Sequence, residues 1–427
     1  MRCMSRRHHL CWAKWAWQLA VILLFSVVCS LEVIFMISTE SDQVHGFDKS
    51  ADDVRTGHLK PLGSHMSPLG NLTVVKTLPT PGSFSENHVK LGLPLVLRNI
   101  ATAVPAFQLW KDLYLSEKYG DLEVSVEVTK KENRSSPSQK MMMNDFINQY
   151  QSKDLYMVHH ITGDMRNDIS LPRPLQCGGF QRMLVDAVLW LSSGGTKSVL
   201  HNDEFNNFNC LLEGRKEIIL IDQVYRSQVE ADGFMQQGHY SLVDVDMVDI
   251  HKFPGLSQVP FYAVTLHSGD CIYMPARWYH QVRSFGSRNM AFNIWFAQLL
   301  YYNADDCDKV GSLPEFRSLA DYSFTGHTEQ MRASILEEFV SLEVISIEDC
   351  RRQWSQKLKD AGSIDELFHR IDINNDKHLS WHELYAFDIL EIARRFPLLF
   401  SAEENEVDDT PSDSDHRVML NMPHDEL

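Results

Sequence analysis

The 427-residue chain lacks several features that would assign it to common classes of protein. Its eight cysteines include no Cys-x-x-Cys pair, which disfavours thioredoxin-like chemistry. It has 40 Lys and Arg against 57 Asp and Glu, and the formal charge of −17 argues against a nucleic-acid-binding surface. We find no internal repeat, and the strand-like segments do not alternate with helices as they would in a parallel sheet.

Charged residues are also nearly missing from one long apolar run, residues 15–37, where Glu32 is the only charge. About 20 apolar residues are enough to cross a bilayer. Basic residues precede the run and acidic residues follow it, so the positive-inside rule places the N-terminus in the cytosol and the rest in a lumen. A cleaved signal peptide with a small-residue site at 28–30 is the alternative. The apolar character continues past that site, which favours an uncleaved anchor.

The last four residues, 424–427, are His-Asp-Glu-Leu, a retention address of the endoplasmic reticulum that a receptor recognises. Asn71 and Asn133 begin N-glycosylation sequons, which suit that compartment. We therefore predict a single-pass type II protein of the endoplasmic reticulum membrane with a lumenal body, or a soluble lumenal protein if the apolar run is cleaved. The acidic residues of the tail are interpreted as a solvated segment.

The five cysteines after the apolar run would lie in an oxidising lumen, and they are therefore candidates for disulfides. They are Cys177, Cys210, Cys271, Cys307 and Cys350. Cys210 and Cys271 fall in predicted core strands and are interpreted as buried thiols. We predict a disulfide between Cys307 and Cys350.

Short strand-like segments with turn residues between them indicate an antiparallel barrel or jelly roll. A helix is predicted at 107–119, and two strands, 207–212 and 217–221, are predicted to be joined at Glu213-Gly214-Arg215. The strand segments are 93–99, 122–128, 155–158, 187–192, 207–212, 217–222, 263–266, 271–274 and 290–298.

The stretch around His201 carries the chemistry that we expect. His201 and Asp203 are two residues apart, so on an extended segment they project from the same face. An imidazole and a carboxylate placed in this way suit Fe(II), and a second histidine would complete a facial triad. His280, at the end of the segment 269–280, offers that ligand. Zn²⁺ would accept the same residues.

The ordered set of motifs around these ligands resembles the JmjC-domain oxygenases. It comprises His201-x-Asp203, Asn207, Gly214-x-Lys216, Gly269-Asp270, Pro275, Trp278-Tyr279-His280 and Asn293-x-Trp295. It is most similar to the small cupin-type protein hydroxylases, the group that contains the asparaginyl hydroxylase inhibiting hypoxia-inducible factor. The likeness covers about half of the chain, roughly residues 93–296.

This resemblance implies a double-stranded β-helix that uses Fe(II), 2-oxoglutarate and O₂. It implies that His201, Asp203 and His280 bind iron, that Lys216 pairs with the distal carboxylate of 2-oxoglutarate, and that Ser198, Asn207 and Asn293 lie around the cosubstrate and metal. The alternatives are a hairpin charge for Lys216 and strand-end polar residues for the others. Tyr156 is either a further cosubstrate contact or, as we favour, a half-buried strand aromatic.

A second motif follows at 372–383, after a change to helical texture. It matches an EF-hand calcium loop, with Lys377 where glycine is usual and with no convincing partner loop elsewhere. A loop that keeps this shape without binding Ca²⁺ is the alternative. The predicted calcium residues are Asp372, Asn374, Asp376, His378 and Glu383, with Ser380 at the ninth position.

Taken together, the sequence predicts a mainly β protein with a jelly-roll (cupin/JmjC) core, flanking helices and a small α-helical EF-hand-like region. The expected parts are a cytosolic tail and anchor (1–37), a lumenal stem (38–84), the JmjC/cupin domain (85–304), a helical extension (305–360), the EF-hand-like region (361–400) and the acidic tail (401–427). We predict an oxygenase that hydroxylates a side chain of a secretory-pathway protein. A non-catalytic scaffold and an enzyme acting on a small molecule or lipid remain the alternatives.

Overall fold

A computed structural model describes residues 57–134 and 137–400. Within these ranges no helix is both long and apolar enough to span a bilayer. The predicted anchor at 15–37 and the retention tail at 424–427 lie outside the described residues, so their prediction stands untested.

The centre of the molecule is a 10-stranded sheet. Its strands follow the order β1-β2-β12-β8-β13-β7-β5-β3-β4, and β11 pairs with β8 beside this path. Their bounds are β1 Thr73–Val75, β2 Leu95–Leu97, β3 Glu123–Glu127, β4 Gln139–Met142, β5 Tyr156–His160, β7 Leu184–Ser192, β8 Asn206–Ile221, β11 Tyr262–His267, β12 Cys271–Met274 and β13 Tyr279–Phe296. Nearly all pairs are antiparallel, which confirms the predicted jelly-roll class.

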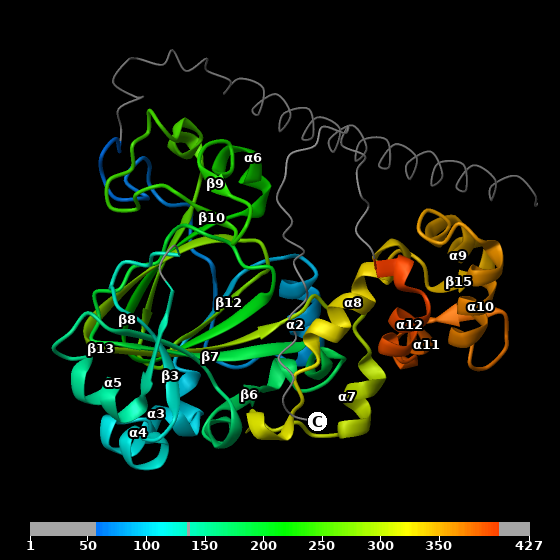
Figure 1. The fold of residues 1–427 in the computed structure, drawn as a ribbon, viewed down its shortest axis with the longest axis horizontal. Coiled ribbons are helices and arrows are strands. Elements are labelled where there is room, and N and C mark those ends of the chain that lie inside the picture. Colours follow the sequence, from blue (N-terminus) through cyan, green and yellow to red (C-terminus); the bar gives the residue numbers. More distant parts are fainter. Residues whose placement is uncertain (1–56, 135–136, 401–427) are drawn as a thin grey trace, which may run out of the picture. The chain divides into compact units, whose positions relative to one another are not determined.

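Two long strands, β8 and β13, run antiparallel over almost their whole length (Figure 1). The first half of β8 also pairs with β12, and its second half pairs with β11. The register shifts between Phe285 and Met290, opposite the stretch that contains Gly214. Gly214 has φ +91°, and a Cβ there would come within 2.6 Å of the Asn289 amide nitrogen. The two strands therefore bend together at this point, and each takes part in both halves of the barrel.

The predicted hairpin at Glu213-Gly214-Arg215 is wrong. The segments on either side of it do not pair with each other, because both pair with β13 as parts of one continuous strand. The glycine marks a bend in β8 rather than a chain reversal. The same pairing extends β13 back to Tyr279, whereas the sequence predicted a strand only from residue 290.

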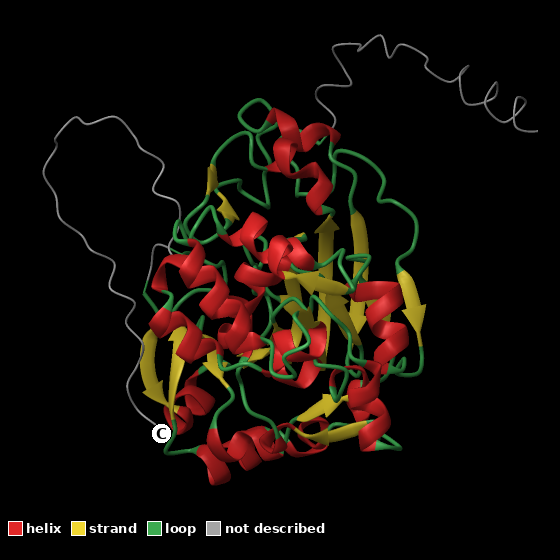
Figure 2. Ribbon diagram, turned by 90° about the vertical axis from the view of Figure 1, so that its right-hand side faces the viewer, coloured by secondary structure: helices red, strands yellow, loops and turns green. Residues whose placement is uncertain are grey.

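Helices cover part of the sheet, as the red and yellow segments of Figure 2 show. They include α2 (Pro81–Phe84), α3 (Pro105–Leu109), α4 (Asp112–Tyr119) and α5 (Met143–Gln149). The helix predicted at 107–119 is split between α3 and α4. Trp110, at the break, is fully buried and its indole nitrogen donates to Asp168 Oδ2 at 2.9 Å, which holds the chain in a non-helical conformation there.

Two disulfides link the described cysteines, Cys177–Cys307 and Cys210–Cys271, and Cys350 is a buried free thiol. The predicted Cys307–Cys350 pair and the predicted thiols at 210 and 271 are therefore wrong. Cys210 and Cys271 lie directly opposite each other on β8 and β12. Sequence alone does not show cross-strand register, so this proximity could not be predicted.

The connection between β8 and β11 forms a small lobe of its own. It contains α6 (Arg226–Val229), β9 (Phe234–Met235), β10 (Tyr240–Ser241) and several short turns. Its apolar side chains form a separate buried cluster that includes Tyr279, the neighbour of His280. The lobe also reaches the other histidine, because Tyr240 forms an isolated β-bridge with His201.

The C-terminal part is helical, as predicted, and has its own apolar cluster. Its helices are α7 (Ala304–Val310), α8 (Gly326–Leu336), α9 (Ile347–Trp354), α10 (Ala361–Ile371), α11 (Trp381–Ala386) and α12 (Ile389–Arg395). Between α7 and α8, strand β14 (Phe316–Ser318) pairs with β6 (Ser170–Pro172).

The EF-hand-like loop between α10 and α11 has a partner that the sequence did not indicate. Its strand β16 (His378–Ser380) pairs antiparallel with β15 (Val344–Ser346), which lies between α8 and α9. Two helix–loop–helix units are thus joined through their loops. The sequence showed no convincing second calcium loop, and the segment 340–346 carries only one carboxylate, Glu343, so its pairing with the loop could not be recognised from a ligand pattern.

Candidate metal and cosubstrate site

Backbone pairing brings the two predicted histidine ligands together. His201 and His280 form an isolated antiparallel bridge, with N···O distances of 3.1 Å and 2.7 Å, and their ring centroids are 4.2 Å apart. Asp203 lies beside both rings, with its Oδ1 4.0 Å from His201 Nε2 and its Oδ2 3.7 Å from His280 Nε2. The ligand atoms of the three residues all lie within 4.8 Å of one another, and they are the one such group among the described residues.

The hydrogen bonds of the rings prepare both histidines for metal binding. His201 Nδ1 is 2.9 Å from the carbonyl oxygen of Val199, and His280 Nδ1 is 3.0 Å from that of Trp278. A carbonyl only accepts, so each Nδ1 carries the proton and each Nε2 presents a lone pair. Both Nε2 atoms face Asp203. Two imidazole nitrogens and one carboxylate are a suitable donor set for Fe(II).

Burial keeps His280 neutral. The side chain is 4% exposed, and desolvation, together with the nearby His201, lowers the pKa of His280 to about 4. A metal therefore displaces no proton from it at neutral pH. The neighbouring Trp278 is buried and donates to the carbonyl of Gly92 at 2.9 Å, so it packs beside the ligand.

Lys216 is a buried cation in the same cavity. It is 5% exposed, and burial lowers the pKa of its ammonium to about 8. Its Nζ donates to Ser284 Oγ at 3.0 Å, across the β8–β13 register, and no carboxylate pairs with it among residues 57–134 and 137–400. A buried charge without a counter-ion is costly, so the site suits an anionic ligand.

The other predicted residues also line this cavity. Ser198 accepts from the Val282 backbone N–H at 2.8 Å, Asn207 donates to Asp203 Oδ2 at 3.4 Å, and Asn293 accepts from the Trp190 indole at 2.8 Å. Asn207 Oδ1 and Asn293 Nδ2 are buried without a partner. Since both side chains are at least 95% buried, these atoms are suited to a ligand.

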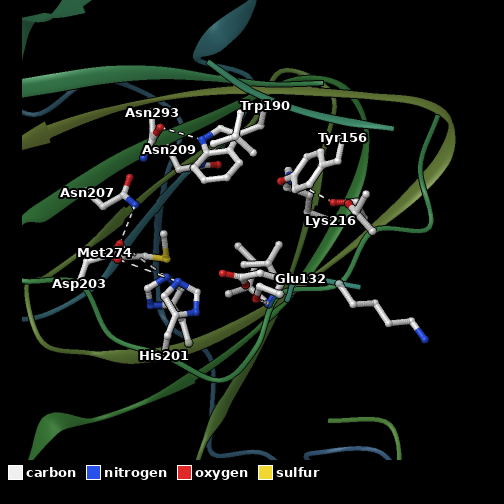
Figure 3. A pocket seen from close by; sticks show the side chains of 18 of the residues that line it. Glu132, Tyr156, Trp190, His201, Asp203, Asn207, Asn209, Lys216, Met274 and Asn293 are labelled. Carbon is white, nitrogen blue, oxygen red and sulfur yellow. Dashed lines mark hydrogen bonds and ion pairs between the residues drawn. The ribbon is translucent and has the colours of Figure 1, made fainter. Parts of the chain in front are cut away.

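Figure 3 shows the cavity, with His201 and Asp203 at one end and Tyr156 and Lys216 at the other. Its volume is about 180 Å³. Strand pairing explains the convergence, because Asn209 lies opposite Asn293 and Lys216 opposite Ser284 on β8 and β13. A metal at the triad and an anion at Lys216 would thus share one enclosed space.

Tyr156 is a half-buried aromatic of β5, as we favoured, and it also lines the cavity together with the residues above. Other lining residues were not predicted: Glu127, Glu132, Arg134, Trp190, Asn209, Met274 and Trp295. The period of two along a strand could have identified some of them, because Asn209 follows Asn207 and Trp295 follows Asn293 on the same face. Glu127 at the end of β3 and Glu132 in the loop after it gave no such signal, since acidic residues at strand ends and in loops usually face solvent.

The predicted calcium residues are brought together in a compact loop. Asp372 and Glu383 are 2% and 5% exposed, and they accept backbone N–H groups of the loop itself. Asn374, Asp376 and His378 are exposed, and Ser380 and Glu383 form a capping box at the start of α11. Calcium binding stays a prediction.

Comparison with known proteins identifies the family to which the central part of the chain belongs. Residues 81–300 match the family described as "Cupin-like domain". Among curated proteins, the chain is 28% identical over 221 residues to the Jumonji C domain-containing protein 5 of Drosophila melanogaster, covering 48% of this chain and 55% of that protein.

Two further relatives carry names that describe an activity. The lysine-specific demethylase 8 of Danio rerio is 28% identical over 215 residues, covering 48% of this chain and 52% of that protein. The bifunctional peptidase and (3S)-lysyl hydroxylase JMJD7 of Homo sapiens is 21% identical over 258 residues, covering 51% of this chain and 81% of that protein. The chain spans about half the length of the first curated relatives that it matches.

We predict that the triad binds one divalent metal ion. Titration of the metal-free protein with Mn(II) or Fe(II), followed by calorimetry, should give one site. Asp203→Ala or His280→Ala should weaken it by more than about 100-fold, because loss of a direct ligand exceeds the effect of losing an outer-shell partner. His267→Ala, an exposed histidine on β11, is the matched control and should bind normally. Equal affinity of Asp203→Ala and the control would refute the assignment.

Proposed function

The chain belongs to the family of cupin-like domain proteins, and we propose that it is an Fe(II)- and 2-oxoglutarate-dependent oxygenase that hydroxylates a side chain of a protein. The observation that carries this proposal is the pairing of two features in one cavity. The His201-Asp203-His280 group is suited to Fe(II), and Lys216 is a buried cation that lacks a carboxylate partner among the described residues.

Each residue of the site would have a distinct role. His201, Asp203 and His280 would hold the iron, which when bound supplies the oxidising chemistry through O₂ and 2-oxoglutarate. Lys216 and Ser284 would hold the distal carboxylate of 2-oxoglutarate, Ser198 would lie near the cosubstrate, and Asn293 would lie near the metal. Asn207 positions Asp203 by hydrogen bonding to its carboxylate. The enclosing walls would exclude bulk water from the reacting groups.

Several considerations favour a protein as the substrate. Two of the relatives named above are described by an action on lysine, whereas another, the tRNA wybutosine-synthesizing protein 5 of Gallus gallus, is named for tRNA. The acidic charge of this chain disfavours nucleic acid. A non-catalytic scaffold is the alternative function, and turnover of the cosubstrate separates it from the oxygenase.

The first test is turnover of 2-oxoglutarate by the full chain in the presence of Fe(II), ascorbate and O₂. We expect slow formation of succinate without substrate, since oxygenases of this kind decarboxylate 2-oxoglutarate in an uncoupled reaction. His201→Ala should abolish it, because a metal ligand is lost.

The cosubstrate pocket has its own variant in this assay. Lys216→Met keeps the stem but removes the charge, and it should raise the KM for 2-oxoglutarate by about 10-fold to 100-fold, the range of a charge-assisted hydrogen bond. No succinate from the wild-type protein, together with no metal binding, would favour the scaffold instead.

We also propose that the protein resides in the lumen of the endoplasmic reticulum, held by the apolar run 15–37 and recovered through the tail 424–427. The two disulfides support an oxidising compartment. In microsomes, the folded body should resist added protease until detergent is present, and carbonate should fail to extract it. Digestion of the body in intact microsomes would refute lumenal placement.

Finally, we propose that the loop 372–383 binds Ca²⁺ weakly. The support is its ligand pattern and its pairing through β15 and β16. Lys377 has φ +67° where glycine is usual, which costs about 1–3 kcal/mol and places a cation beside the site.

Replacing Lys377 with glycine removes both the strained backbone and the positive charge, and this gives a direct test. Lys377→Gly should bind Ca²⁺ at least about 10-fold more tightly than the wild type, since strain and charge are both relieved. Calorimetric titration of the full chain measures this, with Asp372→Ala as the variant that should not bind. No heat up to several millimolar Ca²⁺ in Lys377→Gly would exclude the site.

A further inference from the structure

Glu132, in the loop that follows β3, has hydrogen bonds that reach the segment before the first metal ligand. Its side chain is 18% exposed and lines the cavity together with the metal triad (Figure 3). One carboxylate oxygen, Oε1, accepts from Arg134 Nε at 2.7 Å, and the other, Oε2, accepts from the Val199 backbone N–H at 2.9 Å. Both oxygens are thus engaged by groups of the protein.

The loop that contains Glu132 and the segment before His201 also pair through their backbones. The Lys197 N–H donates to the Lys130 carbonyl at 2.7 Å, and the Glu132 N–H donates to the Lys197 carbonyl at 2.9 Å. The Val199 N–H comes two residues later, and the Glu132 carboxylate accepts it in place of a backbone carbonyl. The side chain of Glu132 therefore extends a short ladder to within two residues of His201.

Val199 connects this ladder with the imidazole of His201. Its N–H is held by Glu132, and its carbonyl oxygen lies 2.9 Å from His201 Nδ1. Because a carbonyl only accepts, Nδ1 carries the proton and the Nε2 lone pair is left for a metal. A shift of the Val199 backbone would remove this acceptor and free the ring to rotate or to change tautomer.

His201 depends on such support more than His280 does. His280 belongs to β13, and it lies opposite Leu220 in the ladder with β8. His201 lies between the end of β7 at Ser192 and the start of β8 at Asn206, and its backbone pairing is limited to isolated bridges. Regular strand pairing thus positions one histidine, whereas a loop positions the other.

Arg134 holds the Glu132 carboxylate from the other side and reaches the lobe. Its guanidinium lies over the ring of Tyr240, 5.2 Å from the centroid. Tyr240 in turn forms the isolated β-bridge with His201. The Glu132–Arg134 pair therefore links two segments that contact His201, one at Val199 and one at Tyr240.

Glu132 is not one of the groups that could hold the metal directly. Among the described residues, only the triad brings its ligand atoms within 4.8 Å of one another. A carboxylate that orients a histidine ligand from outside the coordination sphere is a common feature of metal sites, and its loss weakens metal binding.

We propose that Glu132 is a positioning residue for the first metal ligand. Its carboxylate fixes the Val199 backbone, and the Val199 carbonyl then keeps the proton on His201 Nδ1 and directs Nε2 to the metal. Arg134 fixes the carboxylate. The proposal rests on the metal site of the proposed oxygenase, and it leaves the anion pocket at Lys216 unaffected.

Three variants separate this role from general support of the loop. Glu132→Ala removes the acceptor of the Val199 N–H, whereas Glu132→Gln keeps an amide oxygen that can still accept it. Lys131→Met is the matched control. Lys131 lies in the same loop and pairs with Asp244 at 2.8 Å, but it does not line the cavity.

Metal affinity is measured by calorimetric titration of the metal-free full chain with Mn(II). We expect Glu132→Ala to bind roughly 10-fold to 100-fold more weakly than the wild type, as the loss of an outer partner implies. Glu132→Gln should lie between the two, and Lys131→Met should bind as the wild type does. The melting temperature of each metal-free protein is measured alongside, and if Glu132→Ala does not fold, Glu132→Gln decides.

A spectroscopic measurement reports on the histidines themselves. With Co(II) in the triad, the Nδ1 protons of His201 and His280 should give two exchangeable, strongly shifted proton resonances, since each is hydrogen-bonded to a carbonyl. In Glu132→Ala one resonance should disappear through faster exchange with solvent, and the other should stay. Lys131→Met should keep both.

The succinate assay adds a separate comparison. Glu132→Ala should need roughly 10-fold to 100-fold more Fe(II) for half-maximal succinate formation, in line with its weaker metal binding. The KM for 2-oxoglutarate should be unchanged, because Lys216 and Ser284 are untouched.

The outcomes distinguish the positioning role from the oxygenase function. Wild-type affinity and two unchanged resonances in Glu132→Ala would overturn the positioning role, and so would an equal loss of affinity in Lys131→Met. If the wild type forms no succinate but Glu132→Ala still loses affinity and one resonance, the oxygenase function fails and the positioning role stands. Absence of metal binding by the wild type would overturn both.

Discussion

The antiparallel pairing of β8 with β13 is the constraint on which the site depends. Along these two strands the register places Lys216 opposite Ser284 and Asn209 opposite Asn293. The start of β13 carries His280, which pairs through its backbone with His201. A shift of one residue would turn these side chains to the other face of the sheet, so the register determines whether the site exists.

The bend at Gly214 allows one strand to serve both halves of the barrel. Asn207 and Asn209 lie before it and Lys216 lies after it, yet all three line one cavity. The backbone of β13 bends with it, so the hydrogen bonds of the pair are kept on both sides. The curvature of the two strands encloses the cavity. This curvature also explains why Lys216 is buried while its ammonium still faces the interior of the cavity.

The polar character of the cavity also has a structural cost. Unpartnered atoms at Glu127, Asn207 and Asn293 oppose folding, because a buried polar group without a hydrogen bond is destabilising. Large apolar clusters around the barrel, in the lobe and in the C-terminal helices provide the stabilisation that offsets this cost. A binding site for a metal and an anion is a consistent explanation for polar groups left in this state.

Residue types and spacing along the chain were sufficient for the ligands, because His201, Asp203, Lys216 and Asn207 lie within one short stretch. The structure places these residues around one cavity, and it confirms the jelly-roll class, since alternation along a strand is a local property. Tertiary structure decided what depends on pairing between distant segments. The Cys210–Cys271 bond, the bend that replaced a hairpin, the β15–β16 pair and the inward position of Glu127 all follow from strand register, which no local pattern encodes.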